Sequence, residues 1–89
     1  MLQMYYFDWF GNQEELKEMD KYWKKGCDKV EGITFKGRWV PHQPKWHYVY
    51  IFDTDDYMKF NEAWLKSGAA PRDYSKFTHG SVHVLSEAQ

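Results

Sequence analysis

Apolar and polar positions alternate with two different periods along the chain, and the changes of period divide it into segments. Residues 3–10 are almost continuously apolar and aromatic, which is typical of a strand buried on both faces in the middle of a sheet. Asn12, with Glu15 three residues later, predicts a capped helix start. The apolar face of that helix recurs every three to four residues and comprises Leu16, Met19, Tyr22, Trp23, Gly26 and Cys27.

The middle of the chain is predicted to form a β-hairpin over residues 32–52. Apolar and polar side chains alternate from Ile33 to Trp39, residues 41–44 form a turn, and residues 45–53 are a second strand. We favour the register with an even turn, which pairs Trp39 with Trp46 and Phe35 with Tyr50. A slip of one residue would instead bring Lys36 and Arg38 onto the aromatic face, so the register stays open.

The last third of the chain predicts a helix and a strand. Residues 53–56, with Asp53 or Thr54 as cap, start a helix whose buried stripe is Tyr57, Phe60, Ala63 and Trp64. Ser67 and Gly68 end it, and residues 77–85 form the final strand. The resulting order predicts one α+β domain over residues 1–89, a ferredoxin-like βαββαβ fold with a four-stranded antiparallel sheet and two helices on one face.

The face of the sheet that the helices leave uncovered is predicted to be strongly apolar. We expect Val49, Ile51, Gly80, Val82 and Val84 to face the helices. The opposite, open face would then carry Trp46, Tyr48, Tyr50, Phe52, Phe77, His79, Ser81, His83 and Leu85. Because an apolar patch of this size usually marks an interface or a ligand groove, we expect a homodimer that forms through the open face.

The composition limits which partners the protein is expected to bind and in which cellular compartment it is expected. The net charge of −1 gives no general reason to bind nucleic acid or an anionic membrane, and we expect neither as a partner. Cys27 is the single cysteine, so the chain makes no internal disulfide, and we expect it to be packed rather than reactive. The aromatic first residues do not read as a signal peptide or a membrane span. We therefore expect a cytoplasmic protein.

The order of elements, Trp39–Val40 before the hairpin turn, and residues 53–56 leading into a helix with Trp64 resemble small proteins of the dimeric α/β-barrel superfamily. The resemblance implies a homodimer whose two sheets form a barrel around a cavity. Relatives include monooxygenases, haem-degrading enzymes, isomerases and proteins with no known activity. Asn61, Trp64 and Tyr74 resemble the sets of Asn, Trp and either Tyr or His found in cofactor-free monooxygenases, but their spacing differs, and we expect Trp64 in the core.

Two histidines in the last predicted strand could be taken for metal ligands, but their separation on a strand argues against a shared metal ion. His79 and His83 are four residues apart, which is roughly 13 to 14 Å on a strand, whereas zinc holds nitrogen ligands at about 2.1 Å. We therefore expect no metal and no cofactor. Asp8 interrupts the apolar first strand and needs a partner or water. One reading makes Asp8 and His79 or His83 a proton-transfer set, and the other leaves Asp8 exposed at the strand end or capping the helix.

The function predicted from the sequence is the binding or transformation of a small apolar or aromatic molecule in the barrel cavity, and whether the protein is an enzyme is left open. The candidate catalytic residues are Asp8, His79 and His83, and the candidate ligand-binding residues are Trp46, Tyr48, Tyr50 and Ser81. One alternative is a non-catalytic regulatory or assembly module. Another is an RNA-recognition domain that stacks bases on Tyr5, Tyr48 and Tyr50, against which the near-zero charge counts.

Overall fold

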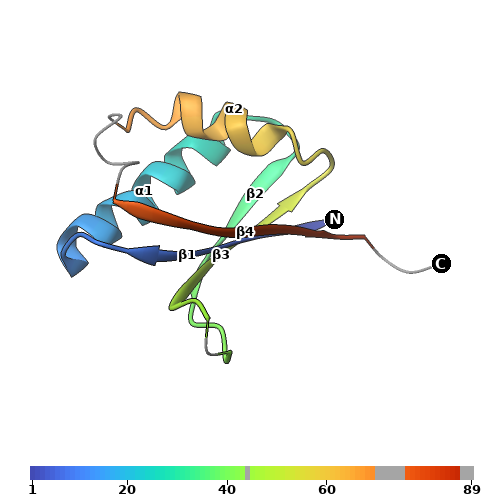
Figure 1. Cartoon of the computed structure of the whole chain (residues 1–89). Coiled ribbons are helices and arrows are strands. Elements are labelled where there is room, and N and C mark those ends of the chain that lie inside the picture. The colour runs from blue at the N-terminus through green and yellow to red at the C-terminus, as the bar shows by residue number, and fades with distance from the viewer. Residues whose placement is uncertain (44, 70–75, 87–89) are drawn as a thin grey trace.

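The computed structural model describes residues 1–43, 45–69 and 76–86, with the backbone but not the side chains of residues 78 and 79. Its elements follow the predicted order (Figure 1). They are β1 (Leu2–Trp9), α1 (Gln13–Asp28), β2 (Ile33–Trp39), β3 (Tyr48–Thr54), α2 (Lys59–Lys66) and β4 (Phe77–Leu85).

The four strands form one antiparallel sheet in the order β2-β3-β1-β4, and both helices lie on one face of it (Figure 1). This is the predicted ferredoxin-like arrangement. β1 is an inner strand, as predicted, but only its helix-facing side chains, such as Tyr5 and Phe7, are fully buried. The loop between β2 and β3 extends on the side of the sheet away from the helices (Figure 1).

The start of α1 is fixed by the predicted capping box. Asn12 Oδ1 accepts a hydrogen bond from the Glu15 backbone N–H at 2.8 Å, and Glu15 Oε1 accepts one from the Asn12 N–H at 3.2 Å.

The second helix starts later than predicted. The predicted start of α2 at Asp53 or Thr54 is wrong. Thr54 ends β3, and its hydroxyl bonds with the backbone of Asp56, so these residues close a turn and α2 begins only at Lys59. Tyr57 lies before the helix and is exposed.

The predicted faces of β3 are reversed in the structure. Tyr50 and Phe52, expected on the open face, are fully buried beneath the helices, while Val49 and Ile51 lie opposite Tyr6 and Met4 on the open face. The helix-facing rings form one cluster around Trp23 of α1, whose centroid is 5.1 Å from that of Phe52 and 6.0 Å from that of Tyr50. Aromatic rings bury more apolar area than Val or Ile, and this decides the orientation of the sheet.

A register shift interrupts β4 and overturns the even alternation predicted for it. Tyr6 pairs with Ser81, whereas Phe7 pairs with His79, so Gly80 is an extra residue between the two pairs. Phe77, predicted on the open face, therefore packs in the core against Phe7 at 4.9 Å between centroids. A side chain at residue 80 would collide with the Tyr6 carbonyl, which explains the glycine.

A second register shift changes the pairing of β2 with β3. Phe35 pairs with Phe52 rather than Tyr50, and Trp39 pairs with Val49 rather than Trp46. The shift falls at residues 36 and 37, where Gly37 has a positive φ of 97° that favours glycine. Arg38 pairs with Tyr50 and consequently points toward α1, where its Nε lies 3.0 Å from Asp20 Oδ1. The sequence left the direction of Arg38 open, and in the structure its side chain lies on the helix side of the sheet.

The two helices approach each other closely at Gly26, where an added Cβ would collide with the backbone carbonyl of Ala63. Alanine normally stabilises a helix interior relative to glycine, but we expect Gly26→Ala to lower the free energy of unfolding by about 1 to 3 kcal/mol, because α2 must move away. Urea unfolding followed by tryptophan fluorescence measures this. Lys17→Ala, an exposed change on the same helix, is the control. An unchanged or raised stability for Gly26→Ala would contradict this packing.

Candidate functional site

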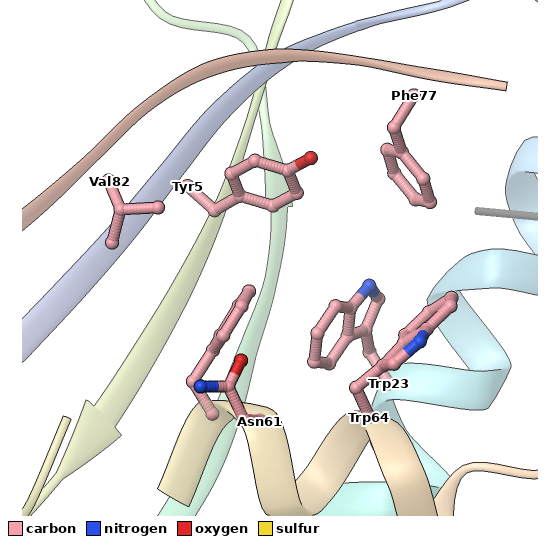
Figure 2. A pocket seen from close by; sticks show the side chains of 7 residues that line it. Tyr5, Trp23, Asn61, Trp64, Phe77 and Val82 are labelled. Atoms are coloured by element: carbon pink, nitrogen blue, oxygen red, sulfur yellow. The ribbon is translucent and has the colours of Figure 1, made fainter. Parts of the chain in front are cut away.

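A cavity of about 220 Å³ lies between the sheet and α2, on the helix side of the domain. β1 and β4 supply its roof and the two helices its floor, as Figure 2 shows. The described lining residues are mostly aromatic: Tyr5, Trp23, Phe60, Asn61, Trp64, Phe77 and Val82. Of these, Val82 was correctly predicted to face the helices.

The aromatic walls support one another. The Trp23 ring stacks on Phe60 with centroids 4.7 Å apart and planes at 28°, and it lies 5.0 Å from the ring of Trp64. Tyr5 meets Phe60 edge to face at 5.8 Å. Rings in mutual contact lose rotational freedom together, so the cavity is held open by its walls rather than by one side chain.

The polar groups in the lining are few. The side chain of Trp23 is only 2% exposed, and its Nε1–H has no hydrogen-bond acceptor among the described residues. Figure 2 shows that this nitrogen points upward from the floor toward Tyr5 and Phe77. Asn61 also lines the cavity (Figure 2), and because it is an exposed residue it stands on the solvent side of the lining. The arrangement offers apolar contact area and a buried hydrogen-bond donor.

Three of the predicted site residues lie together on the opposite, open face. Trp46, Ser81 and His83 line a shallow groove of about 480 Å³ with Met4 and Tyr6. Trp46 belongs to the loop rather than to the predicted strand, and its carbonyl accepts a hydrogen bond from Gln43 Nε2 at 2.6 Å. Because Gln43 and Trp46 line this groove together with residues of β1 and β4, the loop lies against the open face of the sheet.

Tyr48 and Tyr50 do not join this groove, because they face the helices. The Tyr50 hydroxyl donates to Asp20 Oδ1 at 2.8 Å, and the Tyr48 hydroxyl accepts from Gln13 Nε2 at 3.2 Å. Burial, with the Asp20 charge, raises the pKa of Tyr50 far above its usual range. Neither ring can stack on a nucleobase at the open face, and Tyr5 is buried in the core, so the platform that the RNA alternative needs is not formed by these residues.

Asp8 is partnered by a residue that the sequence did not predict. Asp8 Oδ1 accepts a hydrogen bond from the His47 backbone N–H at 2.8 Å and lies 2.7 Å from His47 Nδ1. Asp8 pairs with Thr78 and Met4 with His83, so Asp8 and His83 are separated by four residues of strand, roughly 13 to 14 Å. They do not form a proton-transfer pair. The side chain of His79 lies outside the described part of the chain.

The structure also bears on metal binding, on membrane-spanning helices and on the reactivity of Cys27. Among the described residues, no group of three or more His, Cys, Asp or Glu side chains could hold a metal ion. None of the described helices is both long and apolar enough to cross a membrane. Cys27 is buried, and that burial, with the Asp28 charge, raises its pKa to about 11. The thiol is therefore packed rather than reactive, as predicted.

The cavity beneath α2 was not predicted from the sequence, although two of its residues belong to the set that the family resemblance singled out. Asn61 and Trp64 both line it, while Tyr74 lies outside the described residues. One signal was present in the sequence. A tryptophan on the core stripe of a helix carries an N–H that needs an acceptor, and the apolar neighbours of Trp23 on that stripe offer none. The chain matches no protein-family model, no curated protein and no solved structure.

The Asp8–His47 contact predicts a dependence of stability on pH. Burial works to raise the pKa of Asp8, but the hydrogen bonds from His47 outweigh it and lower the pKa from 3.8. A lowered pKa gives stability above the unfolded value that is lost as the pH falls through the folded value. Asp8→Asn should therefore destabilise the protein at about pH 6, and the difference from the native protein should shrink as the pH falls below about 4.

Urea unfolding at several pH values measures this difference. Glu14→Gln, which removes an exposed carboxylate on α1, is the matched control and should leave stability nearly unchanged. A difference between native protein and Asp8→Asn that is as large at about pH 3 as at about pH 6 would show that the charge of Asp8 does not stabilise the fold.

Proposed function

We propose that the protein binds a small, largely apolar aromatic molecule in the cavity between the sheet and α2. The observation that carries the proposal is the cavity itself, about 220 Å³ walled by aromatic rings that pack on one another. Protein interiors seldom keep voids larger than a water molecule, so a ligand would supply contacts that the walls lack. An apolar cavity of about 150 Å³ accepts benzene, so this one suits a molecule of one or two rings.

This proposal moves the ligand away from the place predicted from the sequence. The prediction put it at the open face, within a barrel, in contact with Trp46, Tyr48, Tyr50 and Ser81. The helix-side cavity offers deeper apolar contact than the open-face groove. We propose binding rather than a monooxygenase-like or isomerase-like reaction, because the described lining supplies contact area and hydrogen bonds but no carboxylate, imidazole or thiol.

The open face of the sheet supports a second part of the proposal, that two copies of the chain associate through it. Its central rows are Tyr6 and Ser81, then Ile51, Met4 and His83, while Val49 beside Tyr6 is already buried within the subunit. These two rows contain no carboxylate or ammonium group; the charged Lys45, Asp8 and Asp53 lie around them on the same face. Trp39 and Leu85, exposed by 56% and 54%, extend the apolar surface at its edges. A chain of 89 residues gains considerably from a partner, because its own core is small.

A dimer that binds no small molecule would fit the alternative of a regulatory or assembly module. A cytoplasmic location, inferred from the single Cys27, is part of the proposal.

Filling the cavity should weaken binding. Val82 lines it from β4, and Val82→Phe should weaken the binding of indane by about tenfold or more, because the new ring occupies the ligand's space. Titration followed by tryptophan fluorescence, to which Trp23 and Trp64 of the lining contribute, and by calorimetry, measures the affinity. Val84→Phe is the matched control, since Val84 is on the same face of β4 but outside the described lining. If both variants bind indane equally, or if neither indane nor its ketone 1-indanone binds the native protein, the proposed site is refuted.

A charge on the open face should separate the subunits. Ile51 lies opposite Met4 in the centre of that face, and Ile51→Lys would bury an unpaired ammonium group in the dimer. Sedimentation velocity should show a dimer for the native protein and a dissociation constant raised at least about tenfold for the variant. Leu65→Lys, on α2 at a position 82% exposed, is the control. A native protein that stays monomeric over the accessible concentrations would rule out the dimer.

A further inference from the structure

We infer that Trp23 determines which ligand the cavity accepts, by donating its indole N–H to an uncharged oxygen acceptor on the bound molecule. The inference rests on the proposed function and adds the ligand's chemical class. That class is a one- or two-ring aromatic compound that carries a ketone, aldehyde or similar carbonyl group.

The first support is that the donor is buried and unpaired. Trp23 is 2% exposed, and its Nε1–H meets no acceptor within the described structure. Buried N–H groups nearly always have a partner, because losing hydration without one costs free energy. The nitrogen borders the cavity and points toward its roof (Figure 2), so a molecule in the cavity is the partner in reach.

The second support is that Trp23 cannot readily turn elsewhere for a partner. Its ring is held between Phe60, at 4.7 Å, and Phe52, at 5.1 Å, with Trp64 at 5.0 Å. The helix that carries it is fixed by the Asn12 capping box and by the close approach to α2 at Gly26. A donor whose direction is fixed before the ligand arrives loses little conformational entropy on binding, and this favours specificity.

The third support concerns charge. None of the described lining residues carries an ammonium, guanidinium or imidazole group. An ionised carboxylate on the ligand would lose its hydration there without gaining a counter-charge, which is costly. A neutral carbonyl needs one good donor, and Trp23 supplies one. Asn61, on the solvent side of the lining, can serve a second polar group.

The test compares indane with 1-indanone, which share a bicyclic skeleton and differ in one carbonyl group. Removing the carbonyl changes the cost of leaving water equally for every variant, so the ratio of the two dissociation constants isolates the contact within the protein. In Trp23→Phe we expect the ratio, indane over 1-indanone, to fall by about three- to tenfold from its native value. In Trp64→Phe, which removes a neighbouring indole, it should stay within about twofold.

A measurement on the native protein keeps the inference testable if Trp23→Phe does not fold. Saturation with 1-indanone should move the Trp23 indole proton resonance downfield and slow its exchange with solvent, and saturation with indane should do neither. Equal effects of both compounds on that resonance, or a ratio that Trp23→Phe leaves unchanged, would overturn the role of Trp23 while leaving binding intact. Failure of both compounds to bind would instead refute the proposed function.

Discussion

The packing of the sheet's aromatic side chains against the Trp23 indole is the constraint on which the rest of the structure depends. Tyr50 and Phe52 of β3 and Phe7 of β1 are all buried in this cluster. Once these rings face α1, the opposite row of each strand must face away from the helices. Phe60 and Trp64 of α2 also pack on Trp23, and the small side chain of Val82 on β4 leaves a space beside them. The cavity is therefore the space that remains because Val82 is too small to fill the gap between β4 and the aromatic rings.

Burying Tyr50 also accounts for the unusual course of β2. A phenol in the core needs an acceptor, and Asp20 of α1 provides it at 2.8 Å. A carboxylate in that half-buried place needs a counter-charge, and Arg38 supplies it through two contacts, at 3.0 and 3.1 Å. Arg38 reaches Asp20 because the register shift at Gly37 turns it to the helix side. The shift also places Trp39 beside Val49 on the open face. The need to pair the Tyr50 hydroxyl in the core therefore also affects which side chains lie on the opposite face of the sheet.

The sequence was sufficient to predict the order of elements, the capping box and the buried stripe of α1, because each depends on local spacing. It was not sufficient to orient β3. Both rows of that strand are apolar, Tyr48, Tyr50 and Phe52 on one side and Val49 and Ile51 on the other, so a period of two does not say which row faces the helices. Assuming an unbroken alternation also hid the shifts at Gly37 and Gly80. The unpaired nitrogen of Trp23 emerges only when the neighbours of its ring are known.

The position of the cavity places ligand binding and subunit association on different faces of the sheet, whereas the barrel interpretation placed both on one face. In that interpretation the ligand lies between two subunits, so that assembly and binding depend on the same surface. In this structure the open face belongs to Met4, Tyr6, Ile51 and His83, while the cavity lies on the other side of the sheet, beneath α2. Residues alternate between the two sides along β1 and β4, so each strand contributes to both. A second copy on the open face would leave the cavity uncovered, and Trp23 would meet its ligand within one subunit.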